Sequence, residues 1–254
     1  IAVRLAAHRT RRARSLEDPC WVEAVRHHAA AGDPKEVVRL GLPAARYLKS
    51  VYQSRAALDL FRMVYTALPT QRREARLDVA LDMADLHART GDIDEGIRVL
   101  RELRVRGRQL AEPERRKVVC KLALLYSRRG GLRRADSLFH QGLSPSRKGR
   151  GRKRQSAREE TLVYLNEHAA LKTTIGEYDA ALSLCKEGLL LARRSRSFRA
   201  REAELNLYAT RANVALRNFE LDSAIEDYEK ALETAEAIGS LGNQAMTLNN
   251  LGKV

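Results

Sequence analysis

The amino-acid sequence of 254 residues predicts an all-α fold, an α-α superhelix formed as a solenoid of about six to seven helical hairpins. Three observations predict it. A pattern of small residue, large residue, glycine-containing turn and second small residue recurs about every 40 residues. Aromatic residues make up only 5% of the chain and β-branched runs are scarce, so a sheet has little to be built from. Three of the six prolines, Pro34, Pro69 and Pro113, stand where helices are expected to begin or connect.

The N-terminal hairpins, in residues 1–69, match the pattern weakly. A first copy is marked by Val25, Gly32 and Val37. The next copy fits Ala45, Ala57, Phe61 and Val64. In each copy the small residue is placed where two helices touch and the large residue fills the neighbouring groove. We therefore expect helices here as well.

The copies within residues 70–143 are clearer. One of them places Ala84, His87, Gly91, Gly96 and Leu100 in the repeating positions. The following copy has Ala123, Tyr126, a turn at Gly130, and then Ala135, Phe139 and Gly142. The shared spacing predicts two complete helical hairpins in this region.

Residues 159–254 continue the pattern. One copy has Ala169, Gly176, Ala181, Cys185 and Gly188, and the next has Ala212, Ala224, Tyr228 and Ala231. A final copy starts at Leu248 and places Leu251 and Gly252 in the leading positions. We expect an incomplete last hairpin and a chain that is a fragment of a longer protein.

The leading small residues lie at positions 45, 84, 123, 169, 212 and 252, so the steps are 39, 39, 46, 43 and 40 residues. The longest step contains the sequence SPSRKGRGRKRQSAR, which has seven basic residues and no acid. We therefore expect a single solenoid over residues 1–254, interrupted by a basic, disordered loop at residues 144–158.

The net charge of +15 is uneven, because residues 218–254 hold seven acids and only two lysines. The basic loop offers a candidate site for nucleic acid or other anions, since cations that displace condensed counterions bind phosphates. Its candidate residues are Arg147, Lys148, Arg150, Arg152, Lys153 and Arg154. The simpler interpretation is a solvated connector, because no aromatic residue is interleaved with the basic ones.

The sequence contains no glycine-rich phosphate loop, no Gly-x-Ser-x-Gly elbow and no His-Glu-x-x-His helix. His27 and His28 are adjacent and point about 100° apart on a helix, so they are poorly placed to share a metal. The other histidines, His8, His87, His140 and His168, are isolated in the sequence. The acid pairs Glu159 with Glu160 and Asp78 with Asp82 are typical of a solvated helix face. We expect no catalytic residue, no metal site and no cofactor.

The three cysteines, Cys20, Cys120 and Cys185, are too few and too far apart for a disulfide framework or a zinc site. Cys185 takes a large-residue core position, where a thiol simply packs. No apolar run approaches the ~20 residues that cross a bilayer, and the N-terminus lacks a signal-peptide core. These features favour a soluble, cytoplasmic protein with no membrane partner.

The motifs LALLYSRRG, IGEYDAAL, DSAIEDYEKALETA and LNNLGKV resemble tetratricopeptide repeats of the long kind, as in kinesin light chains and in the arms of bacterial signal-transducing ATPases. Residues 21–69 resemble the junction that follows the ATPase and winged-helix modules of large bacterial regulators, some of which carry a Ser/Thr kinase or a cyclase. In that family a hairpin of the form HH-x-x-x-GD opens the arm, here His27, His28, Gly32 and Asp33. The resemblance implies kinase or ATPase activity for a parent protein only, because this sequence contains neither motif.

In a tetratricopeptide superhelix the first helix of each hairpin lines the concave surface, so its non-core positions meet a ligand. By register these are Asp78, Asp85, Arg89, Lys117, Lys121, Arg128, Asn166, Thr173, Asn206, Asn213, Arg217, Asn249 and Asn250. Asparagine suits a peptide backbone because its side chain both donates and accepts hydrogen bonds. Lys121, Arg128 and Arg217 are candidates for attracting a carboxylate or an acidic segment.

These observations predict a non-catalytic interaction or sensor arm of a larger signalling regulator. Its partner would be a protein, a peptide or another domain of the same parent chain, held in the concave groove. The alternative is a nucleic-acid-associated repeat protein that uses the basic half and the loop at residues 144–158. A third interpretation is a free-standing scaffold that oligomerises through the last hairpin.

Overall fold

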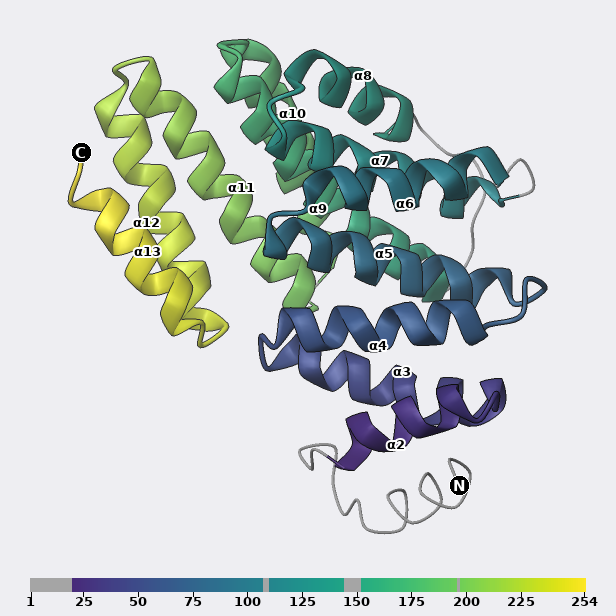
Figure 1. The fold of residues 1–254 in the computed structure, drawn as a ribbon. Coiled ribbons are helices and arrows are strands. Elements are labelled where there is room, and N and C mark those ends of the chain that lie inside the picture. The colour runs from purple at the N-terminus through teal and green to yellow at the C-terminus, as the bar shows by residue number, and fades with distance from the viewer. Residues whose placement is uncertain (1–19, 107–109, 144–151, 196) are drawn as a thin grey trace. The chain divides into compact units, whose positions relative to one another are not determined.

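The computed structural model describes residues 20–106, 110–143, 152–195 and 197–254. In this part of the chain all regular structure is helical, with twelve helices and no strand (Figure 1). The all-α fold expected from the sequence is confirmed. Contacts divide the chain into two compact units, unit 1 at residues 1–129 and unit 2 at residues 130–254. The single solenoid over residues 1–254 stays a prediction.

The helices of unit 1 are α2 (Cys20–Ala30), α3 (Pro34–Ser50), α4 (Ser54–Ala67), α5 (Arg73–Thr90), α6 (Ile93–Arg106) and α7 (Glu112–Arg128). Each packs on the helix that follows it in the unit. Pro34 and Pro113 stand in the first turns of α3 and α7, as expected, because a missing N–H is harmless there. Asp33 caps α3, with its Oδ1 accepting from the Glu36 amide at 3.2 Å.

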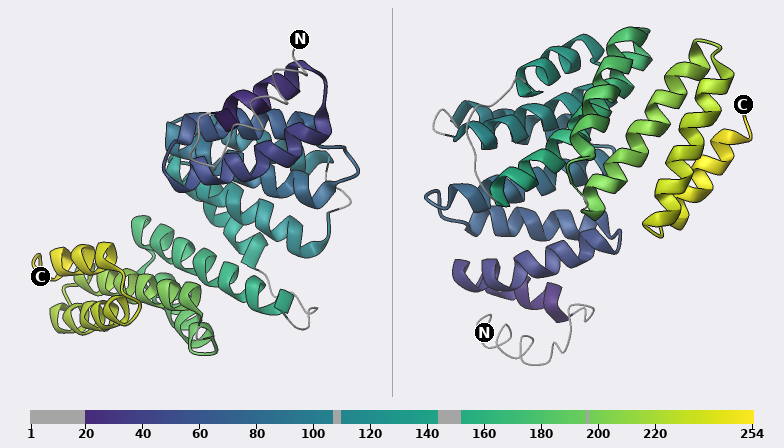
Figure 2. Two further views of the ribbon diagram at one scale, coloured as in Figure 1. Left: turned by 90° about the horizontal axis from the view of Figure 1, so that it is seen from below. Right: turned by 180° about the vertical axis from the view of Figure 1, so that it is seen from behind.

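The helices of unit 2 are α8 (Leu132–Leu143), α9 (Arg152–Thr174), α10 (Tyr178–Ala192), α11 (Phe198–Arg217), α12 (Leu221–Ala237) and α13 (Leu241–Leu251). Helix α9 contacts α8, α10 and α11, and α12 packs between α11 and α13. The hairpins of this unit are seen from two further directions in Figure 2.

The small residues that were placed at helix contacts are buried. Ala45, Ala84, Ala123, Ala169 and Ala212 all have 0% exposure. The large residues of the second helices are equally enclosed, namely Phe61, Leu100, Phe139, Cys185 and Tyr228. Burial raises the pKa of the Cys185 thiol to about 12, so this thiol packs as an apolar group. The register read from the sequence is therefore that of the structure.

The turns between helices use the left-handed backbone region. Gly32, Gly91, Gly130, Gly176 and Gly239 all have positive φ, which glycine adopts without a steric penalty. Two equivalent turns instead place an aromatic residue there, Tyr52 at φ 62° and Phe219 at φ 61°. Both rings point largely into solvent, at 81% and 88% exposure. These two turns could not be recognised from the sequence, because aromatic residues are poor turn markers.

Two elements differ from expectation. The basic segment is not a loop throughout, since α9 begins at Arg152 and includes residues 152–158, while residues 144–151 lie outside the described part. Arginine and lysine are good helix formers, so a run of charge does not by itself prevent a helix. Gly252, expected in a packed small-residue position, is the exposed cap that follows α13, because no described helix packs beyond it.

Candidate partner-binding surface

The first helices of successive hairpins in unit 1 are α3, α5 and α7, and their facing side chains are joined by ion pairs. Lys49 Nζ on α3 lies 2.5 Å from Asp82 Oδ1 and 3.4 Å from Asp85 Oδ2, both on α5. Lys121 Nζ on α7 lies 2.5 Å from Asp85 Oδ1. An acidic helix is thus held between two basic ones, and we name these four side chains the unit 1 charge ladder.

An acid of α5 also faces cations of α3 and α7 one turn earlier in the helix, where Asp78 lies near Arg46 and Lys117. Burial raises the pKa of Asp78, against the lowering effect of the nearby Lys117 and Arg46 charges. One of the two unit 1 cations predicted to attract an acidic partner therefore already faces a carboxylate of α5. Lys121 in particular is committed to Asp85, whereas Arg128 lies exposed at the end of α7.

In unit 2 the corresponding first helices, α9 and α11, enclose a hollow of about 250 Å³. Each helix contributes one stripe of residues at spacings of three or four, which is the repeat of a single helix face. The lining residues are Glu159, Glu160, Val163, Asn166 and Glu167 from α9, and Arg199, Glu202, Ala203 and Asn206 from α11. Two of the predicted asparagines, Asn166 and Asn206, thus share one concave site.

The two asparagines are half-buried and differ in what they already bind. Asn166 Oδ1 accepts a hydrogen bond from Thr210 Oγ1 at 2.8 Å, which fixes the amide and leaves its nitrogen as a donor. The Asn206 side chain makes no hydrogen bond to any described residue. Thr210 was not singled out from the sequence, where a threonine inside a helix gives no sign of orienting a neighbour.

The charge of the hollow is opposite to that expected. Among the side chains that the structure describes, four glutamates line it against one guanidinium, that of Arg199. Glu159 also has a structural role, because its Oε1 accepts from Ser197 Oγ at 2.6 Å and Ser197 in turn caps α11. Glu159 and Glu160, expected on a solvated helix face, belong to the site. A hollow whose described lining has an excess of carboxylates favours a cationic group.

The remaining predicted positions of unit 2 lie outside the hollow. Asn213 Oδ1 accepts from the Tyr228 hydroxyl at 2.8 Å, and Arg217 is exposed near the end of α11. Asn249 and Asn250 are on α13, where Asn250 Oδ1 accepts from Lys253 Nζ at 3.3 Å. The structure therefore brings together two of the five predicted asparagines.

Comparison with known structures gives the fold. No family model and no curated protein matches the sequence. BtubC (BKLC) from P. vanneervenii superposes over 94% of this chain and 92% of its own, with a TM-score of 0.65 at 15% identity. A Podosopora anserina putative kinesin light chain with nearly identical TPR-like repeats superposes over 84% of this chain and 99% of its own, with a TM-score of 0.61 at 17% identity. The chain has a tetratricopeptide-type fold.

A third similar structure is the signal transduction ATPase with numerous domains from Pyrococcus horikoshii, which contains a tetratricopeptide repeat sensor. It matches 99% of this chain but only 36% of its own length, with a TM-score of 0.56 at 14% identity. The resemblance to tetratricopeptide repeats of kinesin light chains and signal-transducing ATPases, noted from the motifs, is thereby confirmed at the level of fold.

The structure does not describe the side chains of the six basic residues that were predicted to bind nucleic acid or other anions. Arg147, Lys148 and Arg150 lie outside the described residues. Arg152, Lys153 and Arg154 form the start of α9 as backbone, and their side chains also lie outside the description. Among the described helices none is long and apolar enough to span a bilayer.

Two histidines that are isolated in the sequence meet in unit 2. His140 on α8 and His168 on α9 have ring centroids 4.9 Å apart, and both reach the Asp136 carboxylate. Burial lowers the pKa of His168 even though Asp136 opposes the shift, so this ring is neutral near neutral pH. Isolation in the sequence does not prevent this contact, because the packing of α8 on α9 brings together positions 28 residues apart.

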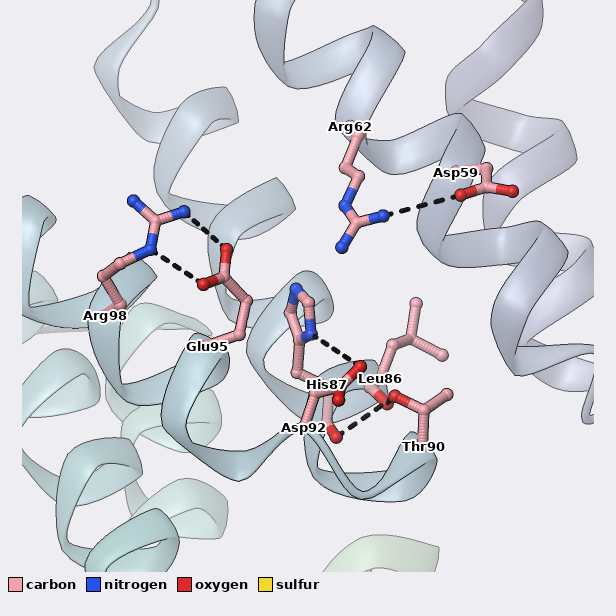
Figure 3. A network of polar contacts seen from close by, with 8 residues as sticks. All are labelled: Asp59, Arg62, Leu86, His87, Thr90, Asp92, Glu95 and Arg98. Carbon is pink, nitrogen blue, oxygen red and sulfur yellow. Dashed lines mark hydrogen bonds and ion pairs between the residues drawn. The ribbon is translucent and has the colours of Figure 1, made fainter.

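His87 occupies a core position in α5, as predicted, and is fully buried. Figure 3 shows it between two ion pairs, Arg62 with Asp59 and Arg98 with Glu95. The contact that reaches the ring is from Asp92 Oδ2, 4.0 Å from His87 Nδ1. Burial lowers the pKa of His87, and the Arg62 charge adds to this effect.

Proposed function

We propose that this chain is a non-catalytic protein-interaction arm that binds an extended, basic peptide in the hollow between α9 and α11. One observation carries the proposal: Asn166 and Asn206 face one concave site together with four glutamates. Asparagine amides recognise a peptide main chain, and carboxylates recognise a lysine or arginine side chain. The same hollow thus supplies both parts of a peptide-recognition site.

The peptide main chain is held by the two amides. The Asn166 nitrogen donates to a peptide carbonyl while its Oδ1 keeps the bond to Thr210. Asn206 has both a donor and an acceptor to offer to the next peptide unit. Each such hydrogen bond contributes about 0.5–1.5 kcal/mol net, so together they position the peptide more than they determine its affinity.

The preference for a basic peptide comes from Glu160, Glu167 and Glu202. A lysine or arginine side chain entering the hollow forms charge-assisted hydrogen bonds, which contribute about 1.5–3 kcal/mol each. Ordering the peptide costs part of this free energy, so we expect dissociation constants on the order of micromolar. Binding should weaken as the salt concentration rises, because salt screens the charges.

The arm belongs, in this proposal, to a larger cytoplasmic signalling regulator. Its similarity to a structure that contains a tetratricopeptide repeat sensor supports this role. The occupant is a partner peptide or a basic segment of the regulator itself. The peptide shifts the equilibrium between conformations of the arm only as far as its affinities for those conformations differ. The change in conformation then alters the activity of the attached module.

The test uses the whole chain and a pair of labelled peptides that differ only in carrying lysines or glutamates. We expect the basic peptide to bind more tightly and the joint Asn166→Ala and Asn206→Ala substitution to weaken it about tenfold. Asn249→Ala is the matched control, since Asn249 is an exposed asparagine on α13, outside the hollow. Fluorescence anisotropy at two salt concentrations measures all four combinations.

A charge reversal sharpens the test. Glu202→Lys should weaken the basic peptide and strengthen the acidic one, because Glu202 is an exposed lining residue whose change leaves the core intact. The proposal fails if the asparagine pair changes nothing, or if the acidic peptide is preferred by the unmodified chain. Tighter binding of labelled DNA or RNA than of either peptide would instead favour the nucleic-acid alternative.

A further inference from the structure

A second cluster of polar side chains lies in unit 2, away from the hollow. Asp136 and His140 are four residues apart on α8 and therefore share one helix face. His168 joins them from α9. Asp136 is partly exposed, His140 is 67% exposed and the His168 side chain is only 2% exposed. The cluster thus has one buried end and one end open to solvent.

The three potential ligand atoms are close together. His168 Nε2 lies 2.7 Å from Asp136 Oδ1, and His140 Nε2 lies 3.6 Å from the same oxygen. All three ligand atoms are within 4.8 Å of one another. Four-coordinate zinc holds its ligand atoms at about 2.0–2.2 Å, which places neighbouring ligands roughly 3.3 Å apart. Small side-chain rotations bring the cluster to that geometry.

The buried ring is held in place by its surroundings. Phe139 stacks on His168, with ring centroids 5.0 Å apart and an interplanar angle of 18°. The stacking fixes the plane of the imidazole so that Nε2 points at Asp136. A ligand whose orientation is fixed before binding loses less entropy when the ion arrives.

We infer that Asp136, His140 and His168 form a binding site for a first-row divalent cation, with zinc as the best fit. Two imidazole nitrogens and one carboxylate oxygen are a donor set that suits zinc. Three protein ligands leave a fourth position for water at the exposed end, beside His140. The ion would join α8 to α9, because the helices supply two ligands and one ligand respectively.

Lys172 is the main competitor for this site. Its Nζ lies 2.8 Å from Asp136 Oδ1 and 2.7 Å from Glu177 Oε2. An arriving cation therefore displaces the ammonium group from Asp136, but the pair with Glu177 remains available to it. The nearby positive charge still repels the ion, so the site is weaker than one with the same ligands alone.

The experiment is a zinc titration of the tag-free chain against a chromophoric chelator, followed by cobalt absorption to report coordination geometry. We expect a single zinc ion per chain and a tetrahedral cobalt spectrum. His140→Ala should weaken binding about tenfold or more, since it removes one of the three ligands at the exposed end of the cluster. Lys172→Met should tighten binding about fivefold, because it removes the competing charge. His27→Ala, which removes a histidine on α2, should leave zinc affinity unchanged.

These variants separate a metal site from a hydrogen-bond network. A purely structural network has no reason to bind zinc more tightly when Lys172 is lost. Zinc should also raise the melting temperature of the wild-type chain and not that of His140→Ala, because a ligand stabilises the state that binds it. Equal zinc affinity in wild type and His140→Ala, or no tightening in a Lys172→Met chain that keeps its helical spectrum, overturns the assignment.

Discussion

Arg211 and Asp227 form a two-pronged ion pair between the two helices of one hairpin. Arg211 Nε on α11 donates to Asp227 Oδ2 at 2.6 Å, and Nη2 donates to Oδ1 at 2.5 Å. The Asp227 side chain is 8% exposed and the guanidinium also lies 5.4 Å from the Tyr208 ring. The hydrogen bonds that Arg211 donates to Asp227 raise the pKa of the Arg211 guanidinium. It fixes the angle between α11, which lines the hollow, and α12.

Removing the acidic partner should destabilise unit 2. Asp227→Ala leaves a largely buried guanidinium without its carboxylate, which we expect to cost about 1–3 kcal/mol of unfolding free energy. Glu229→Gln is the control, because Glu229 is an exposed acid on the same helix. Urea denaturation followed by circular dichroism measures both variants. An Asp227→Ala chain as stable as Glu229→Gln would mean that the pair contributes nothing net.

The aromatic residues at positive φ should be replaceable by glycine with a gain in stability. Phe219 has φ 61° and 88% exposure, so its ring buries little surface that glycine would lose. A glycine at this position relieves the strain of the left-handed backbone, but it also raises the conformational entropy that the chain loses on folding. The first effect is the larger one, so we expect Phe219→Gly to stabilise the chain by about 0.5–1 kcal/mol. Gly176→Ala, at the equivalent turn of the preceding hairpin, should destabilise it by a similar amount.

Tyr52→Gly provides an internal comparison. The Arg89 guanidinium lies 5.8 Å from the Tyr52 ring, so the glycine variant loses a cation–π contact as it relieves strain. Its gain should therefore be smaller than that of Phe219→Gly in the same melting experiment. A loss of stability in Phe219→Gly would show that its ring makes a contact more favourable than the strain it incurs.

The register of the solenoid was predictable because small residues at helix contacts recur at fixed spacing. Ala84 and Ala123 occupy the same position of the repeat, and both are buried. Only a small side chain lets two helices approach each other at that position. The same register assigned Asn166 and Asn206 to the first helices of successive hairpins, and both line the hollow. Periodicity alone is enough to place such residues on a face.

Contacts between side chains of different helices were not predictable from the periodicity of the sequence. Glu160 is indistinguishable in sequence from a solvated acid, and only the approach of α11 makes it part of a hollow. His140 and His168 meet because α8 packs on α9 across the irregular 46-residue step, whose geometry spacing does not determine. The register predicts Lys121 on the face of α7 that meets a ligand, but periodicity carries no information on its ion pair with Asp85, which depends on the charge of a residue on another helix.

His87 should make stability depend on pH. Its pKa is lowered from 6.5 by burial and by Arg62, while Asp92 and Glu95 partly oppose the shift (Figure 3). The unfolded chain thus takes up a proton near pH 6.5, whereas the folded chain resists it. The contribution to stability is full above pH 6.5 and is lost as the pH falls from there through the lowered folded value.

The measurement is the unfolding free energy of wild type and His87→Leu at pH 8, 6.5 and 5. Leucine fills a similar volume without a titrating group, so His87→Leu should lose less stability between pH 8 and pH 5 than wild type does. Carboxylates and the other histidines contribute equally to both chains and cancel in the difference. Parallel pH profiles would contradict a neutral, buried His87.

Gly188 should not accept a side chain, because α10 approaches α11 closely at this position. A Cβ built on Gly188 would lie 2.7 Å from Leu207 Cδ1 and 2.8 Å from Cδ2, and Leu207 is fully buried and cannot swing into solvent. We expect Gly188→Ala to cost about 1–3 kcal/mol of unfolding free energy, in spite of the better helix propensity of alanine. Gly242→Ala is the matched control, since Gly242 lies in α13 with nothing within 4 Å of the added Cβ. That variant should be neutral or more stable by up to about 1 kcal/mol, because only the propensity term acts there. The same shift in both variants would mean that α10 and α11 are farther apart at Gly188 than the structure places them, and that the wall of the hollow behind α11 is correspondingly loose.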